Sequence, residues 1–416
     1  MAGAAAAVSP PVEKADATAW IAVAAGALGA MLATLDISIV NSALPTIQGE
    51  IGATGTEGTW IATAFLVAEI IIIPLSAWLE RLLGLRTLLI VAVSAFTAFS
   101  VLCGIATDLT TMIIGRTGQG FMGGALIPTA MTIVAKRLPP SQQPIGMALF
   151  GMTVVLGPVM GPLVGGWLTE NLSWHYAFFV NVPVCALLLA LLFIGLPHEK
   201  PDWVYLREAD WAGIAGMILG LGGLTIVLEE GHREEWFDST LIVQLTLMTV
   251  VGFALLTYGQ LYARKPVLKL RLMLSRQFAS VVVMALALGM VMYGSTYVIP
   301  QFLAIISDYN ALQTGLVIFW MGVPAFLLMP VLPFMIRRIH IRIAVGAGMF
   351  IMALSCFVSI NLTAESGGGV FTESQFLRGI GMILTMMFLN QATVASVAKE
   401  DAGDASGIFN AARNLG

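Results

Sequence analysis

Five ionisable residues lie inside otherwise apolar stretches of this chain: Asp36, Glu69, Arg116, Arg378 and Arg413. A charge near the centre of a bilayer costs about 2.5–3.5 kcal/mol even on lenient scales, so such residues are rare and usually functional. At about 1.5 Å per residue, the first three fall at similar depths, roughly 9–15 Å from one end of their stretches. Asp36, Glu69 and Arg116 therefore predict a site where a carboxylate exchanges a proton beside an arginine.

Two interpretations of these charges remain open. Protonation could change the interaction of Arg116 with Asp36 or with Glu69 and so favour one of two conformations. Alternatively, a static buried ion pair could fix the register of the helices. Glu69 could also contact a cationic substrate.

Enzyme chemistry is not expected. The sequence shows no nucleophile–histidine pair and no histidines or cysteines at metal-ligand spacing, so we predict no catalytic residue, no metal and no cofactor. The net charge of −4, without a basic stripe, argues against nucleic acid as a partner.

Membrane-spanning helices must position the charged residues. The 416 residues are 58% hydrophobic and 11% charged, with a mean hydropathy of +0.90, whereas soluble domains carry about 25% charged residues. Apolar runs of about 20 residues recur, each long enough to cross a bilayer. We therefore predict an all-α polytopic membrane protein with spans at 18–45, 58–79, 87–106, 110–135, 144–169, 175–196, 211–228, 240–262, 278–303, 313–336, 343–361 and 373–398, and a further helix from about 405.

Basic residues are concentrated in alternate loops between these spans. One set of loops holds nearly all of them, including Arg81, Arg86, Lys136 and Lys265, whereas the opposite set holds a single one, Arg233. The positive-inside rule then predicts a cytoplasmic N-terminus. We expect the chain to lie in the cell's inner (cytoplasmic) membrane. The N-terminal tail lacks the basic region of a cleaved signal peptide, so the first span is expected to be retained.

Two patterns repeat in the second half of the chain and predict two lobes. The spacing of Pro74, Arg81 and Arg86 recurs at Pro330, Arg337 and Arg342, and that of Arg116 and Lys136 nearly recurs at Arg378 and Lys399. The predicted domains are an N-terminal tail (1–17), an N-terminal six-helix lobe (18–196), an inserted two-helix segment (197–276) and a C-terminal lobe (277–416).

One expected span reads GPVMGPLVGG at 157–166 and is typical of a flexing gate. Glycines at every fourth position line one face and allow a neighbouring backbone to approach closely, while prolines remove backbone donors and favour kinks. The gating residues are Gly157, Pro158, Gly161, Pro162, Gly165 and Gly166. In the loop after Arg81, Gly84 and Arg86 suit a tight cytoplasmic turn that latches two helices together.

Several motifs resemble those of one transporter family. LDISIVNSALP at 35–45 is similar to its first-helix motif and GRTGQG at 115–120 to its fourth-helix motif. GPVMGPLVGG is similar to its antiporter motif, and WHYAFFVNVP at 174–183 to the segment that follows. On these motifs the chain resembles the major facilitator superfamily, in particular the fourteen-helix drug:proton antiporters of the EmrB/QacA group and, among them, the EmrB type.

The resemblance implies a two-lobed helical bundle with an inserted central helix pair. It also implies efflux of amphipathic or cationic drugs, or other toxic small molecules, against an inward flow of protons. Asn41, Gln119 and Arg378 are the candidate residues of the substrate cavity. In a double-membraned bacterium, a periplasmic membrane-fusion adaptor and an outer-membrane channel would be partners.

The chain also departs from the family pattern. Ala77 and Arg81 stand where the family has Gly and Asp, which predicts a weaker cytoplasmic latch. The family pattern has no charged residue at the position of Glu69, so Glu69 is a candidate specificity determinant. The chain stops in NAARNLG, which resembles the start of the penultimate helix, so the C-terminal lobe is expected to be incomplete.

Two other functions fit the same spans. An importer or facilitator of a small nutrient could share the fold, although the GPxxGP pattern favours export. A non-transporting membrane scaffold or sensor would not need Asp36 or Arg116.

Overall fold

Helices form every regular element in the part of the chain that the computed structural model describes, residues 14–309, 311–328, 331–363 and 366–416. The first half contains α1 (Ala17–Glu50), α2 (Gly55–Gly58), α3 (Trp60–Leu83), α4 (Leu85–Gly104), α5 (Leu109–Gly123), α6 (Leu126–Arg137), α7 (Gln143–Asn171), α8 (Tyr176–Phe179) and α9 (Asn181–Gly195). The middle contains α10 (Val204–Arg207), α11 (Trp211–Glu230) and α12 (Thr240–Tyr262). The last part contains α13 (Arg276–Ile306), α14 (Ala311–Leu328), α15 (Leu332–Arg338), α16 (Ile341–Val358), α17 (Phe371–Ala395) and α18 (Ala402–Leu415).

The predicted spans correspond to these helices. Within the described ranges, nine helices are long and apolar enough to cross a membrane. The expected span at 110–135 is divided into α5 and α6 beside Gly123 and Gly124, where two low-propensity residues weaken the helix. The expected span at 313–336 is likewise divided into α14 and α15.

Several helix ends have local causes in the sequence. Asp16 and Asp108 cap α1 and α5, because each side chain accepts a hydrogen bond from a backbone N–H three residues on. Gly84 alone separates α3 from α4 and has a φ of +77°, a conformation that favours glycine.

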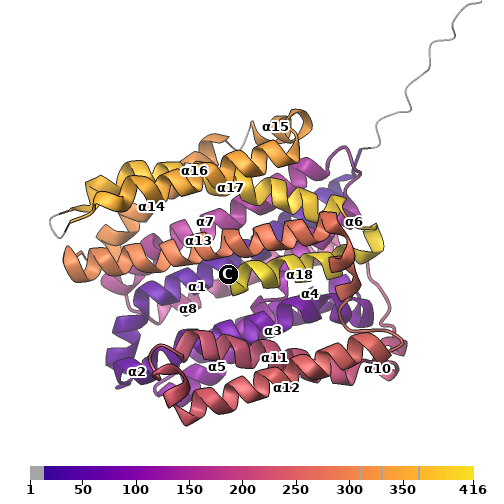
Figure 1. Ribbon diagram of the computed structural model, residues 1–416, viewed down its shortest axis with the longest axis horizontal. Coiled ribbons are helices and arrows are strands. Elements are labelled where there is room, and N and C mark those ends of the chain that lie inside the picture. Colours follow the sequence, from indigo (N-terminus) through magenta and orange to yellow (C-terminus); the bar gives the residue numbers. More distant parts are fainter. Residues whose placement is uncertain (1–13, 310, 329–330, 364–365) are drawn as a thin grey trace, which may run out of the picture.

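The packing forms a two-lobed bundle with the inserted pair on one side. In the first lobe α1 packs against α6, α7 and α9, while α3 packs against α5. In the second, α17 packs against α14 and α16, and α13 against α18. Figure 1 shows α11 and α12 along the lower side, α14, α16 and α17 along the upper side, and α13 and α18 between them.

Contacts between the lobes are made mainly by three helices of the first lobe. α7 packs against α14 and α17, while α3 and α6 pack against α18. The inserted helix α11 lies on α12 and on α3, so α3 contacts both the insertion and the second lobe.

The predicted domain limits at 196/197 and 276/277 lie beside the end of α9 and the start of α13. Most of the predicted tail (1–17) and Pro330, a member of the repeat pattern, lie outside the described residues.

Two ends of the bundle differ in charge. The end that we call the basic end holds the pairs of Glu80 with Lys136 and of Arg81 with Asp404. The opposite, acidic end holds α2 and α8, which lie at the left of Figure 1. There Trp174 donates a hydrogen bond to Glu50 at 2.8 Å.

Candidate functional site

Asp36 lies at the centre of a buried polar network inside the first lobe. Its Oδ2 accepts a hydrogen bond from Arg116 Nη1 at 2.6 Å. Its Oδ1 accepts from Asn181 Nδ2 at 2.6 Å and from Gln119 Nε2 at 3.2 Å. All four residues are 0% exposed. The predicted pair of Asp36 and Arg116 is therefore present, and two amides complete the solvation of the carboxylate.

A serine from a fourth helix closes the network. Ser100 Oγ on α4 accepts hydrogen bonds from Gln119 Nε2 at 2.6 Å and from Asn181 Nδ2 at 2.8 Å. Because α1, α4, α5 and α9 each supply a member, the network ties together four helices that are separated in the sequence. We refer to Asp36, Ser100, Arg116, Gln119 and Asn181 as the buried polar network.

Arg116 has other partners besides Asp36. Its Nε donates to the Ile61 carbonyl at 3.2 Å and its Nη1 to Gln119 Oε1 at 3.0 Å. Its guanidinium also lies 4.2 Å from the centroid of the Phe65 ring, a cation–π distance. The arginine would therefore keep favourable contacts if the carboxylate became neutral.

Ser100 and Asn181 were missed as site residues from the sequence. Asn181 stands at the start of α9, the remainder of which is wholly apolar. A lone amide in such a helix is a signal for an intramembrane hydrogen bond, and it could have indicated this residue. Ser100 offers no comparable signal, since serine also bonds to its own helix.

Glu69 does not join this network. Its side chain is 3% exposed, and the described residues give it no hydrogen bond or ion pair. The expected grouping of Asp36, Glu69 and Arg116 is thus divided: two form the ion pair, while Glu69 lines a separate cavity between α3, α11 and α18.

The other proposed cavity residues lie apart from the network. Asn41 is exposed on α1. Arg378 is buried in α17, where its Nη1 donates to Gln375 Oε1 at 3.4 Å. Gln119 is the only one of the three candidates that contacts Asp36.

The glycine face of α7 lies against the helix that carries Asp36. A Cβ atom at Gly157, Gly161 or Gly165 would overlap Thr34, Ser38 or Ser42 of α1, respectively. The expected close approach of a neighbouring helix is therefore present, and α1 is that neighbour. The helix continues through Pro158 and Pro162, and Gly166 is buried beside this face.

The second lobe lies against another face of α7. A Cβ atom at Gly315 of α14 would contact Pro162 and Leu163, and one at Gly322 would overlap Val159. α7 is thus placed between the helix of Asp36 and the second lobe.

The predicted latch residues form a tight turn at the basic end. Gly84 makes the one-residue link between α3 and α4, and Leu85 N–H donates to Glu199 Oε2 at 2.8 Å. The guanidinium of Arg86 lies 5.4 Å from the Phe193 ring of α9.

Arg81 joins the two lobes. Its two terminal nitrogens bind the Asp404 carboxylate at 2.6 and 3.4 Å, and one of them also donates to the Val267 carbonyl at 3.3 Å. Asp404 belongs to α18 and is 0% exposed. The departure from the family pattern at Arg81 therefore supplies an ion pair between the lobes.

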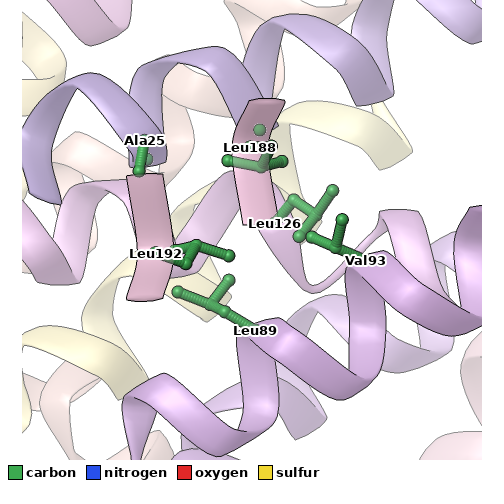
Figure 2. A pocket seen from close by; sticks show the side chains of 8 residues that line it. Ala25, Leu89, Val93, Leu126, Leu188 and Leu192 are labelled. Carbon is green, nitrogen blue, oxygen red and sulfur yellow. The ribbon is translucent and has the colours of Figure 1, made fainter. Parts of the chain in front are cut away.

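One small gap in the first lobe offers no binding site. It lies between α1, α4, α6 and α9, is too small to hold a water molecule, and has only hydrocarbon side chains around it (Figure 2). In the described ranges, no cluster of three or more histidine, cysteine, aspartate or glutamate side chains could hold a metal ion.

Comparison with known proteins identifies the family. Residues 26–416 match the family model of the Major Facilitator Superfamily. The chain is 33% identical over 399 residues to the colistin resistance protein EmrB of Acinetobacter baumannii, covering 96% of this chain and 78% of that protein. It is 32% identical over 391 residues to the multidrug export protein EmrB of Escherichia coli, covering 93% and 76%.

The fold has solved counterparts at low sequence identity. The human organic anion transporter MFSD10 (TETRAN) aligns with a TM-score of 0.66 and 16% identity, covering 98% of this chain and 91% of its own. The helical bundle, the motif positions and these relatives agree, so the chain belongs to the major facilitator superfamily and, within it, to the EmrB-type group.

Proposed function

We propose that this multi-pass membrane protein exports amphipathic drugs or other toxic small molecules across the cytoplasmic membrane, driven by protons that move the other way. The observation that carries the proposal is the buried ion pair of Asp36 and Arg116, because an intramembrane acid beside an arginine is suited to proton exchange. The named functions of the EmrB relatives, multidrug export and colistin resistance, support export as the direction.

Proton uptake would act through Asp36. Breaking a buried ion pair by removing one charge usually costs about 3–5 kcal/mol, because the other charge is left unpaired. Here Arg116 would retain the Ile61 carbonyl, Gln119 and the Phe65 ring, which lowers that cost. A neutral Asp36 would then hold α1 less tightly to α5, and protonation would favour a different packing of α1.

α7 would transmit this change to the second lobe. Its glycine face contacts α1 around Thr34 and Ser38, on both sides of Asp36, and its other side contacts α14. A shift of α1 therefore changes the surface on which the two lobes meet. The prolines of α7 would let this helix bend as the lobes move.

Arg81 and Asp404 would form the cytoplasmic gate. Positive-inside topology places the basic end in the cytoplasm. The pair joins the two lobes at that end and would have to separate when the transporter takes up substrate from the inside.

The energy source would be the proton gradient, without a cofactor. If the source organism has two membranes, we expect a periplasmic membrane-fusion adaptor and an outer-membrane channel as partners. A nutrient importer and a non-transporting scaffold remain the alternatives; neither is favoured by a specific contact of the described residues.

Dye uptake into inverted membrane vesicles tests this function. Ethidium should accumulate when the vesicle interior is acidified, and the accumulation should collapse on addition of a proton ionophore. Vesicles without the protein are the control. Uptake that persists after addition of the ionophore would contradict proton coupling. A complete lack of uptake for every amphipathic dye tested would contradict export.

A further inference from the structure

The segment between α12 and α13 is rich in basic residues. Residues 263–276 read ARKPVLKLRLMLSR, with five basic residues and no acidic one, and we call them the basic linker. Figure 1 shows this segment at the right, between the ends of α12 and α13. Both helices are long and apolar enough to cross a membrane, so the linker would lie at the level of the lipid headgroups.

Two of the five cations are paired within the chain. Lys265 binds Glu208 at 2.6 Å, and Lys269 binds Asp401 at 2.5 Å. Val267, which lies between the two lysines, is buried. This part of the linker is therefore fixed to the helix bundle.

Three arginines of the linker are available to an anion outside the chain. Arg271 and Arg276 are exposed, and no described residue forms a hydrogen bond or ion pair with either. Arg264 is also exposed; it lies within electrostatic range of Glu208, but Lys265 already binds that carboxylate. A guanidinium is suited to bidentate binding of phosphate, so the linker offers three groups to a ligand that contains phosphate.

An exposed apolar side chain lies between two of these arginines in the sequence. Leu274 is 85% exposed, more than any other large apolar side chain of the described residues, and Tyr262 at the end of α12 is 71% exposed. Tyrosine is enriched where spans meet the membrane surface, and a leucine at this level gains free energy when it enters the acyl chains. A basic segment with exposed apolar residues is typical of a surface that binds anionic lipid.

We propose that the basic linker binds an anionic phospholipid of the cytoplasmic leaflet, with Arg264, Arg271 and Arg276 toward the headgroup phosphate and Leu274 among the acyl chains. The positive-inside orientation places this end of the bundle at that leaflet, where anionic lipids attract basic segments. The bound lipid would hold the segment that joins the inserted pair to the second lobe. This binding needs no substrate and no proton gradient, so it stands or falls separately from the proposed function.

Native mass spectrometry of the purified chain in neutral detergent tests the site, with phosphatidylglycerol and phosphatidylcholine as probes. The test variant carries Arg264→Gln, Arg271→Gln and Arg276→Gln. A basic residue near anionic lipid contributes about fivefold in affinity, so the variant should bind its first phosphatidylglycerol about a hundredfold more weakly than the parent chain. Phosphatidylcholine should bind both chains equally weakly, because its headgroup has no net charge.

The matched control removes the same charge elsewhere. Lys200→Gln, Arg338→Gln and Arg342→Gln change three exposed residues in other loops of the predicted cytoplasmic side. This variant should bind phosphatidylglycerol within about threefold of the parent chain, since the effect of a surface charge falls off within a Debye length. Equal losses in the two triple variants would mean that only net charge matters and would overturn the site.

Three further arms distinguish lipid binding from other causes. The variant with Arg264→Lys, Arg271→Lys and Arg276→Lys keeps the charges and should retain most of the binding, which a folding defect would not explain. Leu274→Gln should weaken phosphatidylglycerol binding severalfold. Glycerol 1-phosphate, a headgroup without acyl chains, should not displace the lipid; displacement would identify a soluble phosphate as the ligand. Phosphatidylglycerol binding that is unchanged in the glutamine variant would contradict the proposal.

Discussion

At the scale of residues, the carboxylate of Asp36 is held by three donors from two neighbouring helices. Arg116 supplies charge, while Gln119 and Asn181 supply amide N–H groups. Hydrogen bonds to a charged group contribute about 1.5–3 kcal/mol each, and they offset the large cost of removing the carboxylate from water. Loss of one donor should therefore destabilise the folded protein measurably.

Replacing Asn181 by Ala tests this dependence. The variant removes one bond to Asp36 and one to Ser100, so we expect the free energy of unfolding to fall by about 1–3 kcal/mol. Thermal denaturation in detergent measures the change. Asn171→Ala is the control, because that exposed amide bonds only to the Trp167 carbonyl of its own helix. Equal melting temperatures for the two variants would argue against a stabilising network.

The pair of Asp36 and Arg116 was predictable from the sequence, whereas the hydrogen bonds of Ser100 and Asn181 that complete the network were not. Asp36 and Arg116 are charged residues at similar depth, and attraction in a low dielectric brings such groups together. Glu69 shares that depth but lies on the side of α3 that contacts α11 and α18. Depth alone does not say which way a side chain faces around its helix, so this part of the grouping failed.

At the scale of elements, α7 connects the acid to the second lobe. Its glycines at 157, 161 and 165 leave no space between its backbone and α1. Close packing of small residues is a main source of helix association in membranes, where the hydrophobic effect between helices is absent. The contact is so tight that, when α1 moves, either α7 moves with it or the two helices separate.

Replacing Gly161 by Ala should damage this contact. The new methyl group would overlap Ser38, and overpacking of this kind costs about 1–3 kcal/mol. We expect a lower melting temperature and slower transport. Gly346→Ala is the matched control, since that glycine of α16 has open space where the Cβ would stand and alanine favours helix. A Gly161 variant as stable and active as the Gly346 variant would contradict the role of this face.

The spacing of the glycines predicted a close helix contact, and it did not identify the partner. Lengths and positions of the helices were also predictable, because apolar runs of about 20 residues are a strong signal. The divisions between α5 and α6 and between α14 and α15 were not, since a short break leaves the hydropathy of the run unchanged.

At the scale of the whole molecule, the two lobes are joined at the basic end by charges. Arg81 of α3 binds Asp404 of α18, and Ser406 donates to the Pro128 carbonyl of α6 at 3.0 Å. Lys269 of the inserted segment binds Asp401 of the second lobe at 2.5 Å. Asp404 is fully buried, so removal of Arg81 would leave an unpaired buried charge, which is strongly destabilising. These contacts connect the first lobe and the inserted segment to the second lobe at that end.

Reversing the charge of Arg81 should open this end. In Arg81→Asp, two acids would face each other. The readout is the rate at which a maleimide labels the cysteine of Ser406→Cys in a chain without its native cysteines. Arg81→Asp should increase this rate. The double reversal Arg81→Asp with Asp404→Arg should restore slow labelling. The exposed pair of Lys265 and Glu208 provides the control, and its reversal should leave the labelling rate unchanged. Failure of the double variant to recover would contradict a gate based on this pair.

The arrangement of the lobes could not be deduced from the sequence. In a soluble protein an apolar stripe marks the buried face of a helix, whereas here the faces toward lipid and toward protein are both apolar. The position of α11 on α3 is an example, because its sequence is apolar on all sides. The repeated arginines indicated two lobes but not which helices would meet.

The most direct test of the mechanism is substrate-linked proton movement in proteoliposomes that contain Asp36→Asn. The control is Asp108→Asn. Asp108 lies outside the spans, and hydrogen bonds from Thr111 hold the pKa of its carboxyl below the usual value, so this residue is ionised in the parent chain throughout the assay. We predict that Asp108→Asn exports ethidium uphill with proton counterflow and that Asp36→Asn retains dye binding but shows neither uphill export nor proton flux. Uphill export at the parent rate by Asp36→Asn would contradict the mechanism.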